Sequence, residues 1–199
     1  MRKLVALIIS LIGLLGVQTN MPAAETSKHV FIIPIREDID PPLVYLVRRG
    51  VKEAMEAKAD LIILDIETNG GRVNVTREIT KILENFKGET VAYVDDKAYS
   101  AGAIISIAAQ KIYMAPGSEI GAAAPVTMAP GGGSTQDLPT TVETKAVSVV
   151  SAMARGLAEK NDYNVEVVEA MINRNKELII DGKTLKPKGE LLTLNNIEA

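Results

Sequence analysis

The chain has 199 residues, of which 47% are hydrophobic and only 4% aromatic, and its formal net charge is −3. This composition excludes disordered and collagen-like proteins and predicts one globular domain with an aliphatic core. The lack of cysteine excludes disulfides, thiolate nucleophiles and cysteine-based zinc sites, and the single histidine argues against a histidine-built metal cage. Because no cluster of lysine and arginine could hold a phosphate backbone, we expect no nucleic-acid partner, and nothing indicates a metal or a cofactor.

The first 24 residues have the pattern of a secretory signal peptide. Arg2 and Lys3 precede an apolar run over residues 4–17, and small residues follow it. This run is shorter than the roughly 20 residues that a membrane-spanning helix needs. We therefore expect residues 1–24 to be a cleaved leader and residues 25–199 to form an exported domain, periplasmic or otherwise extracytoplasmic.

The next part of the chain alternates between strand-like and helical patterns. Short apolar runs predict strands, and apolar residues three and four positions apart predict the helices between them. We expect Pro34 to stop the first strand and Asp40 to cap the first helix. This alternation predicts an α/β domain with a parallel sheet and right-handed crossovers. The expected strands are 29–34, 61–66, 90–94 and 112–114, and the expected helices lie within residues 41–55, 79–86 and 101–109.

The C-terminal part begins with a change of composition. Glycines, prolines and small polar residues predict a surface loop over residues 126–139, which could act as a lid over a substrate. A long helix with apolar positions over residues 146–157 and a shorter one over residues 167–172 follow. Asp181-Gly182, between two strand-like pieces, predicts a β-hairpin.

The turn Thr68-Asn69-Gly70-Gly71 directly follows a predicted buried strand and precedes a helix. Two adjacent glycines let backbone N–H groups point at an oxyanion or a phosphate without obstruction by side chains. The same glycines also suit a tight turn that needs positive φ angles. The residues alone leave both interpretations open.

Ser100 stands where another predicted strand gives way to a helix. A serine hydroxyl at a helix N-terminus lies near the positive end of the helix dipole, which favours a nucleophile. Serine is also a preferred helix cap, which is the alternative interpretation. Ala98 stands where the nucleophile elbow of α/β-hydrolases has its first glycine, so this motif gives no support to that family.

A nucleophilic serine needs a base, and the choice is narrow. His29 lies at the edge of the first predicted strand, where we expect it to face solvent, so a Ser-His-Asp triad is disfavoured. A lysine serves only if its pKa falls from about 10.4 to about 7 or 8, which requires an apolar surrounding. Lys145 opens the apolar stripe of the long helix and is the candidate, although a lysine at a helix start is commonly solvated.

With these residues in place, the chain resembles the NfeD-type membrane-associated serine proteases, relatives of signal peptide peptidase A and ClpP. The most specific matches are Ser100-Ala101-Gly102 and the segment 114–126, and the glycine turn at residues 68–71 corresponds to a Thr-Pro-Gly-Gly turn of the family. The resemblance implies a ClpP/crotonase-like fold with repeated β-β-α and β-α-β units around a mostly parallel sheet.

The resemblance also implies a serine endopeptidase with a Ser-Lys dyad. Ser100 takes the position of the nucleophile and Lys145 that of the general base, while the backbone N–H groups of Gly71 and Ala101 form the oxyanion hole. Gly70 and Gly102 are implied to border the substrate. The implied substrate is an apolar peptide segment, with a stomatin-like membrane protein as partner and a homo-oligomer as the assembled form.

Two departures from the family pattern keep other functions open. Asn69 replaces the usual proline of the turn, and the sequence stops at Ala199 without the membrane region of longer relatives. These departures motivate a second hypothesis, a non-catalytic scaffold that binds a membrane partner. A crotonase-type enzyme acting on acyl thioesters is the third, because one fold serves several chemistries.

Overall fold

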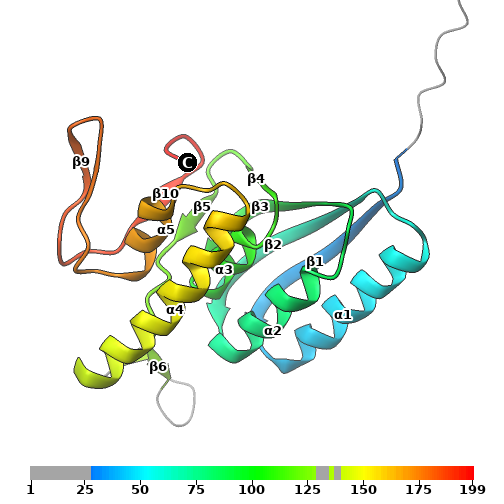
Figure 1. Ribbon diagram of the computed structural model, residues 1–199, viewed down its shortest axis with the longest axis horizontal. Coiled ribbons are helices and arrows are strands. Elements are labelled where there is room, and N and C mark those ends of the chain that lie inside the picture. Colours follow the sequence, from blue (N-terminus) through cyan, green and yellow to red (C-terminus); the bar gives the residue numbers. More distant parts are fainter. Residues whose placement is uncertain (1–27, 129–134, 137–139) are drawn as a thin grey trace, which may run out of the picture.

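The centre of the domain is a six-stranded, mostly parallel sheet (Figure 1). The computed structural model describes residues 28–128, 135–136 and 140–199, so the predicted leader and most of the predicted loop at 126–139 lie outside the described residues. The elements in chain order are β1 (Val30–Ile39), α1 (Pro41–Glu56), β2 (Leu61–Gly71), α2 (Val73–Leu83), β3 (Glu89–Tyr99), α3 (Ala101–Ile107), β4 (Lys111–Met114), β5 (Glu119–Gly121), β6 (Thr127–Met128), β7 (Thr135–Gln136), α4 (Thr140–Lys160), α5 (Val165–Ile172), β8 (Leu178–Ile180), β9 (Lys183–Lys186) and β10 (Thr193–Asn195).

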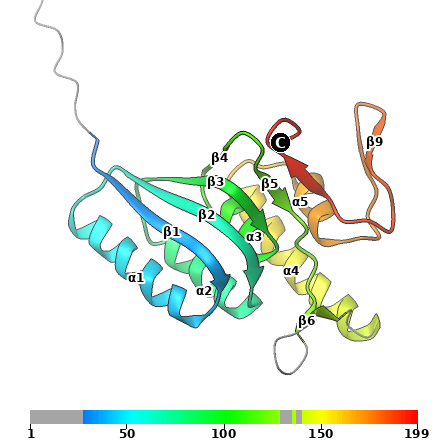
Figure 2. The same cartoon turned by 180° about the vertical axis from the view of Figure 1, so that it is seen from behind.

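The sheet has the strand order β1-β2-β3-β5-β10, and β4 also pairs with β3. The pairs among β1, β2, β3, β4 and β5 are parallel, whereas β10 runs antiparallel to β5 (Figure 2). Consecutive parallel strands are joined by α1 and α2, as the alternating sequence pattern predicted. The α/β class with a mostly parallel sheet is therefore confirmed.

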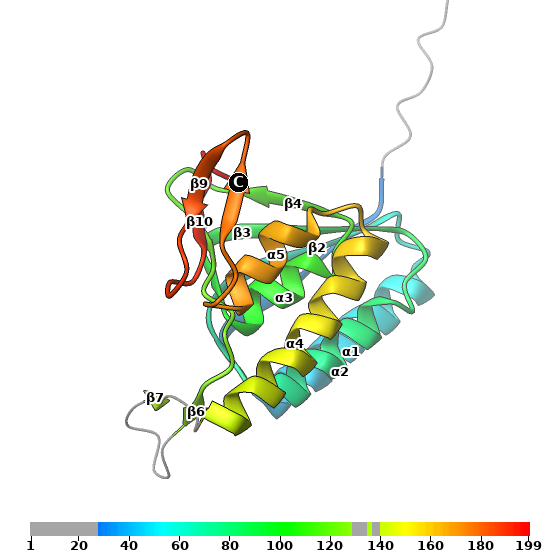
Figure 3. The same ribbon diagram turned by 60° about the vertical axis from the view of Figure 1, so that its left-hand side comes forward.

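One face of the sheet carries the hydrophobic core. Buried and more exposed residues alternate along the strands, and the buried Ile33, Leu64 and Val94 are at most 2% exposed. The helices that bury them lie on the same side of the sheet (Figure 3). On the other face, Ile32 is 65% exposed and Tyr113 is 56% exposed. The positioning of a site at the strand ends therefore depends on packing from one side only.

Strand β1 continues past Pro34 to Ile39, so the expectation that Pro34 stops it is wrong. β1 lies at the edge of the sheet, where a strand can lack an N–H group. The carbonyl of His29 accepts a hydrogen bond from Leu61 N–H at 3.3 Å, and the alternation of the strand from there turns the backbone of Pro34 away from β2. The missing N–H group therefore costs no hydrogen bond within the sheet.

Helix α1 begins at Pro41 with Asp40 at its N-cap position, as expected, but the Asp40 side chain makes no capping hydrogen bond. The carboxylate of Asp40 instead accepts a hydrogen bond from Arg72 Nε at 2.7 Å, across the ends of β1 and β2. Aspartate at this position commonly accepts a hydrogen bond from the first turn of a helix, but here the Asp40 side chain pairs with Arg72 instead. It lies at the edge of the pocket described below.

In the C-terminal part, α4 packs against α3 and α5, and β10 joins the sheet by pairing with β5. The predicted hairpin forms from β8 and β9. Its turn has positive φ at both central residues, 51° at Asp181 and 75° at Gly182, as a two-residue hairpin requires. None of the helices in the described part of the chain has the length and apolar character needed to cross a membrane.

Lys186 is an unpredicted buried cation just beyond the C-terminus of α5. It is only 2% exposed, and its Nζ donates hydrogen bonds to the carbonyls of Asn173 at 2.9 Å, Arg174 at 3.3 Å and Lys176. Burial lowers the pKa of Lys186. These bonds tie the hairpin to the negative end of α5.

Candidate active site

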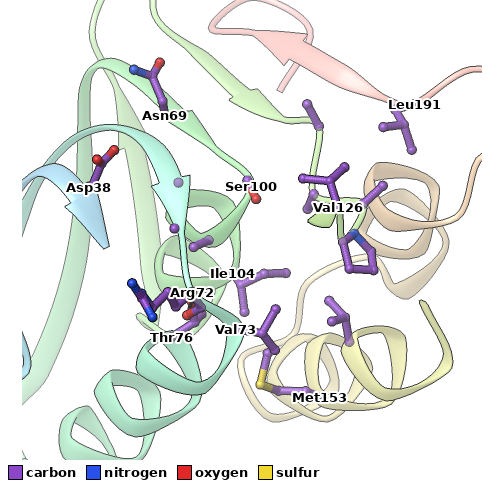
Figure 4. A pocket seen from close by; sticks show the side chains of 18 of the residues that line it. Asp38, Asn69, Arg72, Val73, Thr76, Ser100, Ile104, Val126, Met153 and Leu191 are labelled. Carbon is purple, nitrogen blue, oxygen red and sulfur yellow. Dashed lines mark hydrogen bonds between the residues drawn. The ribbon is translucent and has the colours of Figure 1, made fainter. Parts of the chain in front are cut away.

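A pocket of about 370 Å³ opens where β2 and β3 end, next to the N-terminus of α3. Figure 4 shows Ser100 at its centre, with Asn69 on one side and Val126 and Leu191 on the other. Parallel strands of an α/β sheet place their carboxyl ends at one edge, which is where such sites are usually found. Most of the lining atoms are apolar, contributed by α2, α3, α4 and the segment after β5.

Ser100 adopts a strained backbone conformation, with φ 52° and ψ −114°. Its own N–H donates to the carbonyl of Gly121 at 2.9 Å, and this bond fixes the turn from β3 into α3. Ser100 occupies the N-cap position of α3, as the cap interpretation expects, but its hydroxyl makes no capping hydrogen bond. Ser100 is half-buried at a strained backbone position, and its hydroxyl has no hydrogen-bond partner among the described residues. This combination is typical of a functional residue.

Residues 68–71, predicted as a turn after the strand, form the last four residues of β2 instead. Gly70 lies directly against Ser100 and has a φ of 115°. A Cβ atom at this position would be 2.6 Å from Ser100 Cβ and 3.0 Å from Ser100 Oγ, which is too close for any side chain. The Gly70 N–H donates to Thr68 Oγ1 at 3.0 Å, and the Thr68 hydroxyl also donates to the carbonyl of Glu37. Glycine is therefore required both by its backbone angle and by its contact with the serine.

Gly71 and Ala101 line the same pocket as Ser100. Ala101 is the first residue of α3, so its N–H belongs to the helix turn that has no carbonyl partner within the helix. A Cβ on Gly71 would be 2.4 Å from the carbonyl oxygen of Ile39, so the close pairing with β1 also requires glycine here. The structure thus brings together four of the predicted site residues, including Gly70.

Gly102 and Lys145 do not line this pocket. Gly102 is buried, and a Cβ there would be 2.5 Å from Cγ2 of Thr68, so its small size lets α3 approach β2. Lys145 lies near the start of α4 and is exposed, whereas Val150 and Met153 of the same helix reach the pocket. His29 is exposed, as expected, and also lies outside the pocket lining.

The pocket also has a charged edge that the sequence pattern did not reveal. Asp38, Asp40 and Arg72 line it, and the Asp40–Arg72 ion pair has a length of 2.7 Å. Asp38 owes its position to a β-bulge, in which Glu37 takes a φ of 62° and the register against β2 shifts between Arg36 and Asp38. No glycine marks this bulge, so the sequence carries no signal for it.

The chain is similar in sequence to two membrane proteins. The chain is 38% identical over 188 residues to membrane protein NfeD1b of Bacillus subtilis (strain 168), covering 94% of this chain and 40% of that protein. It is 27% identical over 152 residues to membrane-bound protease PH1510 of Pyrococcus horikoshii, covering 75% and 34% respectively. The chain thus spans about two fifths or less of the length of these relatives.

The fold is also that of a known protease domain. The structure superposes with a TM-score of 0.71 and 24% identity on the 1510-N membrane-bound stomatin-specific protease, solved as a lysine-to-alanine mutant in complex with a substrate peptide. The match covers 87% of this chain and 71% of that one. It confirms the ClpP-like fold that the sequence resemblance implied.

The strongest assignment comes from a family model that describes the NfeD1b N-terminal domain. It matches residues 29–199, a range that contains the glycine turn, Ser100 and all of the described helices. This chain belongs to the NfeD1b N-terminal domain family.

Proposed function

We propose that this domain is a serine endopeptidase that cleaves apolar peptide segments, with Ser100 as the nucleophile and Lys145 as the general base. The observation that carries the proposal is the Ser100 side chain. Its backbone is strained, its hydroxyl makes no capping hydrogen bond, and it lies against Gly70 in a mainly apolar pocket. The relation to a membrane-bound protease supports the same reaction class.

The proposed chemistry is acyl transfer. Ser100 Oγ attacks the peptide carbonyl, and the N–H groups of Gly71 and Ala101 stabilise the negative charge that develops on its oxygen. Lys145 accepts the serine proton and returns it to the leaving amine. Water then attacks the acyl-enzyme, and the serine is regenerated.

Lys145 sets a condition on this mechanism, because it is exposed and lies outside the pocket lining. A lysine amine becomes uncharged near neutral pH only where apolar groups remove water from it. The apolar residues beside Lys145 on α4 include Val149, which is 49% exposed. In the proposed mechanism, a bound apolar substrate covers this part of α4 and brings the dyad together.

The proposed setting is the extracytoplasmic side of a membrane, with residues 1–24 as the leader that directs export. A stomatin-like membrane protein is the proposed partner, since a structural neighbour is named as a stomatin-specific protease. We also propose that the chain works as a homo-oligomer.

A second candidate function is a peptide-binding scaffold without turnover. The exposed position of Lys145 favours it, because a pocket without a base binds a peptide but does not hydrolyse it. The presence of Asn69 in the glycine turn favours it as well. In this case the strained turn at Ser100 is an inherited part of a binding groove.

The two functions are separated by labelling the full chain with a fluorophosphonate probe and locating the adduct by mass spectrometry. The endopeptidase proposal expects an adduct on Ser100, its loss in Ser100→Ala, and its retention in Ser148→Ala, which removes an exposed serine of α4. It also expects Lys145→Ala to abolish hydrolysis of a quenched apolar peptide, while Lys160→Ala, at the other end of the same helix, does not. Peptide binding without an adduct and without hydrolysis would establish the scaffold.

A further inference from the structure

The pocket around Ser100 has two walls of different chemistry. Ile104, Val126 and Met153 belong to an apolar wall, whereas the end of β1 supplies an acidic one (Figure 4). A peptide that fills the pocket therefore meets aliphatic side chains on one side and carboxylates on the other. The second wall bears on which peptides bind.

Several carboxylates of these strands contact a cation. Asp40 is paired with Arg72 at 2.7 Å, and Arg36 is shared by Asp65 at 2.7 Å, Asp95 at 3.0 Å and Glu67. Asp38 is different, because no cation or hydrogen-bond donor contacts its side chain within the part of the chain that the structure describes. Asp38 is exposed to solvent, so its carboxylate is accessible to a ligand.

The position of Asp38 relative to the nucleophile follows from the strand register. Asp38 pairs with Gly70 across β1 and β2, and Gly70 lies against Ser100. Neighbouring strands are about 4.8 Å apart, so Asp38 lies roughly 10 Å from the serine. An extended peptide advances about 3.3 Å per residue, and this separation therefore corresponds to about three residues.

We propose that Asp38 is a specificity-determining residue, which selects apolar peptides that carry a lysine or arginine within about three residues of the bond held at Ser100. This inference rests on the proposed function, because it takes the pocket to be the peptide site. Arg72 does not oppose such a cation, since Asp40 compensates its charge. The substrate class is thus an apolar segment with an adjoining basic residue.

The test measures binding first, in the full-length Ser100→Ala protein, by fluorescence anisotropy of labelled apolar peptides. The peptides carry lysine, glutamine or glutamate at each of three positions on either side of the central bond. An exposed carboxylate is expected to favour the lysine peptide over the glutamine peptide by about two- to fivefold at one position. This preference should shrink as salt is raised from low ionic strength to about 1 M.

Variants then assign the preference to Asp38. Asp38→Asn should bring the lysine-to-glutamine affinity ratio close to one, and Asp38→Lys should invert it in favour of the glutamate peptide. Glu159→Gln, which neutralises an exposed carboxylate of α4 outside the pocket, is the matched control and should leave the ratio unchanged. An unchanged ratio in Asp38→Asn, no preference for lysine in the parent protein, or no binding of any peptide would overturn the proposal.

Hydrolysis by the protein with Ser100 intact separates this inference from the proposed function. Cleavage of every peptide without a charge preference would leave the endopeptidase standing and remove the role of Asp38. Binding with a charge preference but without cleavage would retain Asp38 as the selector of a scaffold and remove the endopeptidase.

Discussion

Replacement of Gly70 by alanine tests whether the glycine-containing end of β2 positions the nucleophile. The new Cβ would lie 2.6 Å from Ser100 Cβ, whereas ordinary contacts begin near 3.4 Å, so one of the two backbones must shift by about 1 Å. A displacement of about 1 Å in an active site costs on the order of 100-fold in rate. We expect the rate of fluorophosphonate labelling at Ser100 to fall by about that factor in Gly70→Ala.

Gly117→Ala is the matched control, because it separates backbone strain from contact with the serine. Gly117 has a φ of 83° and nothing within 4 Å of an added Cβ, so the substitution costs only the strain of the backbone, about 1–3 kcal/mol. Gly70→Ala adds overpacking of about 1–3 kcal/mol, which corresponds to a further loss of about 2–12 °C in Tm. Equal labelling rates and equal Tm values in the two variants, measured by mass spectrometry and calorimetry, would refute the reasoning.

Three further substitutions test interactions around the site and the C-terminal part. Thr68→Val removes the hydroxyl that accepts from Gly70 N–H, so we expect a loss of about 1–3 kcal/mol in urea unfolding, whereas Thr68→Ser should retain most of the stability. Lys186→Met leaves buried carbonyls at the end of α5 without a donor and should cost about 2–4 kcal/mol in the same assay; a neutral effect would contradict the capping role. The hydrogen bond from Lys176 lowers the pKa of Glu169, so its stabilisation is present above about pH 4.3, the usual value for glutamate, and is lost as the pH falls through the lowered pKa. Unfolding measured between pH 2 and pH 7 should therefore show a shallower acid loss in Glu169→Gln, and an identical slope would exclude this ion pair as a source of acid sensitivity.

The sequence predicted the features that depend on local pattern. Apolar runs separated by helical stripes fixed the parallel sheet, and parallel strands necessarily bring their carboxyl ends to one edge. Gly70 and Gly71 are the last residues of β2 and Ser100 directly follows β3, so their common location could be predicted before the pocket was known.

Features that depend on contacts between distant residues could not be predicted in this way. The Asp40 side chain pairs with Arg72, which lies between β2 and α2, instead of making a capping hydrogen bond to α1. At the bulge, the carbonyl of Glu37 accepts a hydrogen bond from the hydroxyl of Thr68, 31 residues away. Glu37 has a positive φ but is not a glycine, so the sequence does not indicate the bulge. Lys186 carries no motif, because its partners are backbone carbonyls that any residue type supplies.

Lys145 was selected by its place beside an apolar stripe, and the stripe does reach the pocket through Val150 and Met153. A helix turns by about 100° per residue, so a residue five positions before Val150 points to a different side. The sequence pattern locates the stripe but not the side of it on which a neighbouring lysine lies.

The edge position of Pro34 has a consequence for the behaviour of the protein in a crowded compartment. A free edge strand offers a row of hydrogen-bonding groups to any other extended chain, which is a common route to aggregation. In β1, the backbone of Pro34 faces outward and contributes no donor, so this row is interrupted near its middle. The domain is proposed to bind apolar, extended peptides in its pocket, and Pro34 thereby disfavours the addition of the same peptides as a strand at the edge of its sheet.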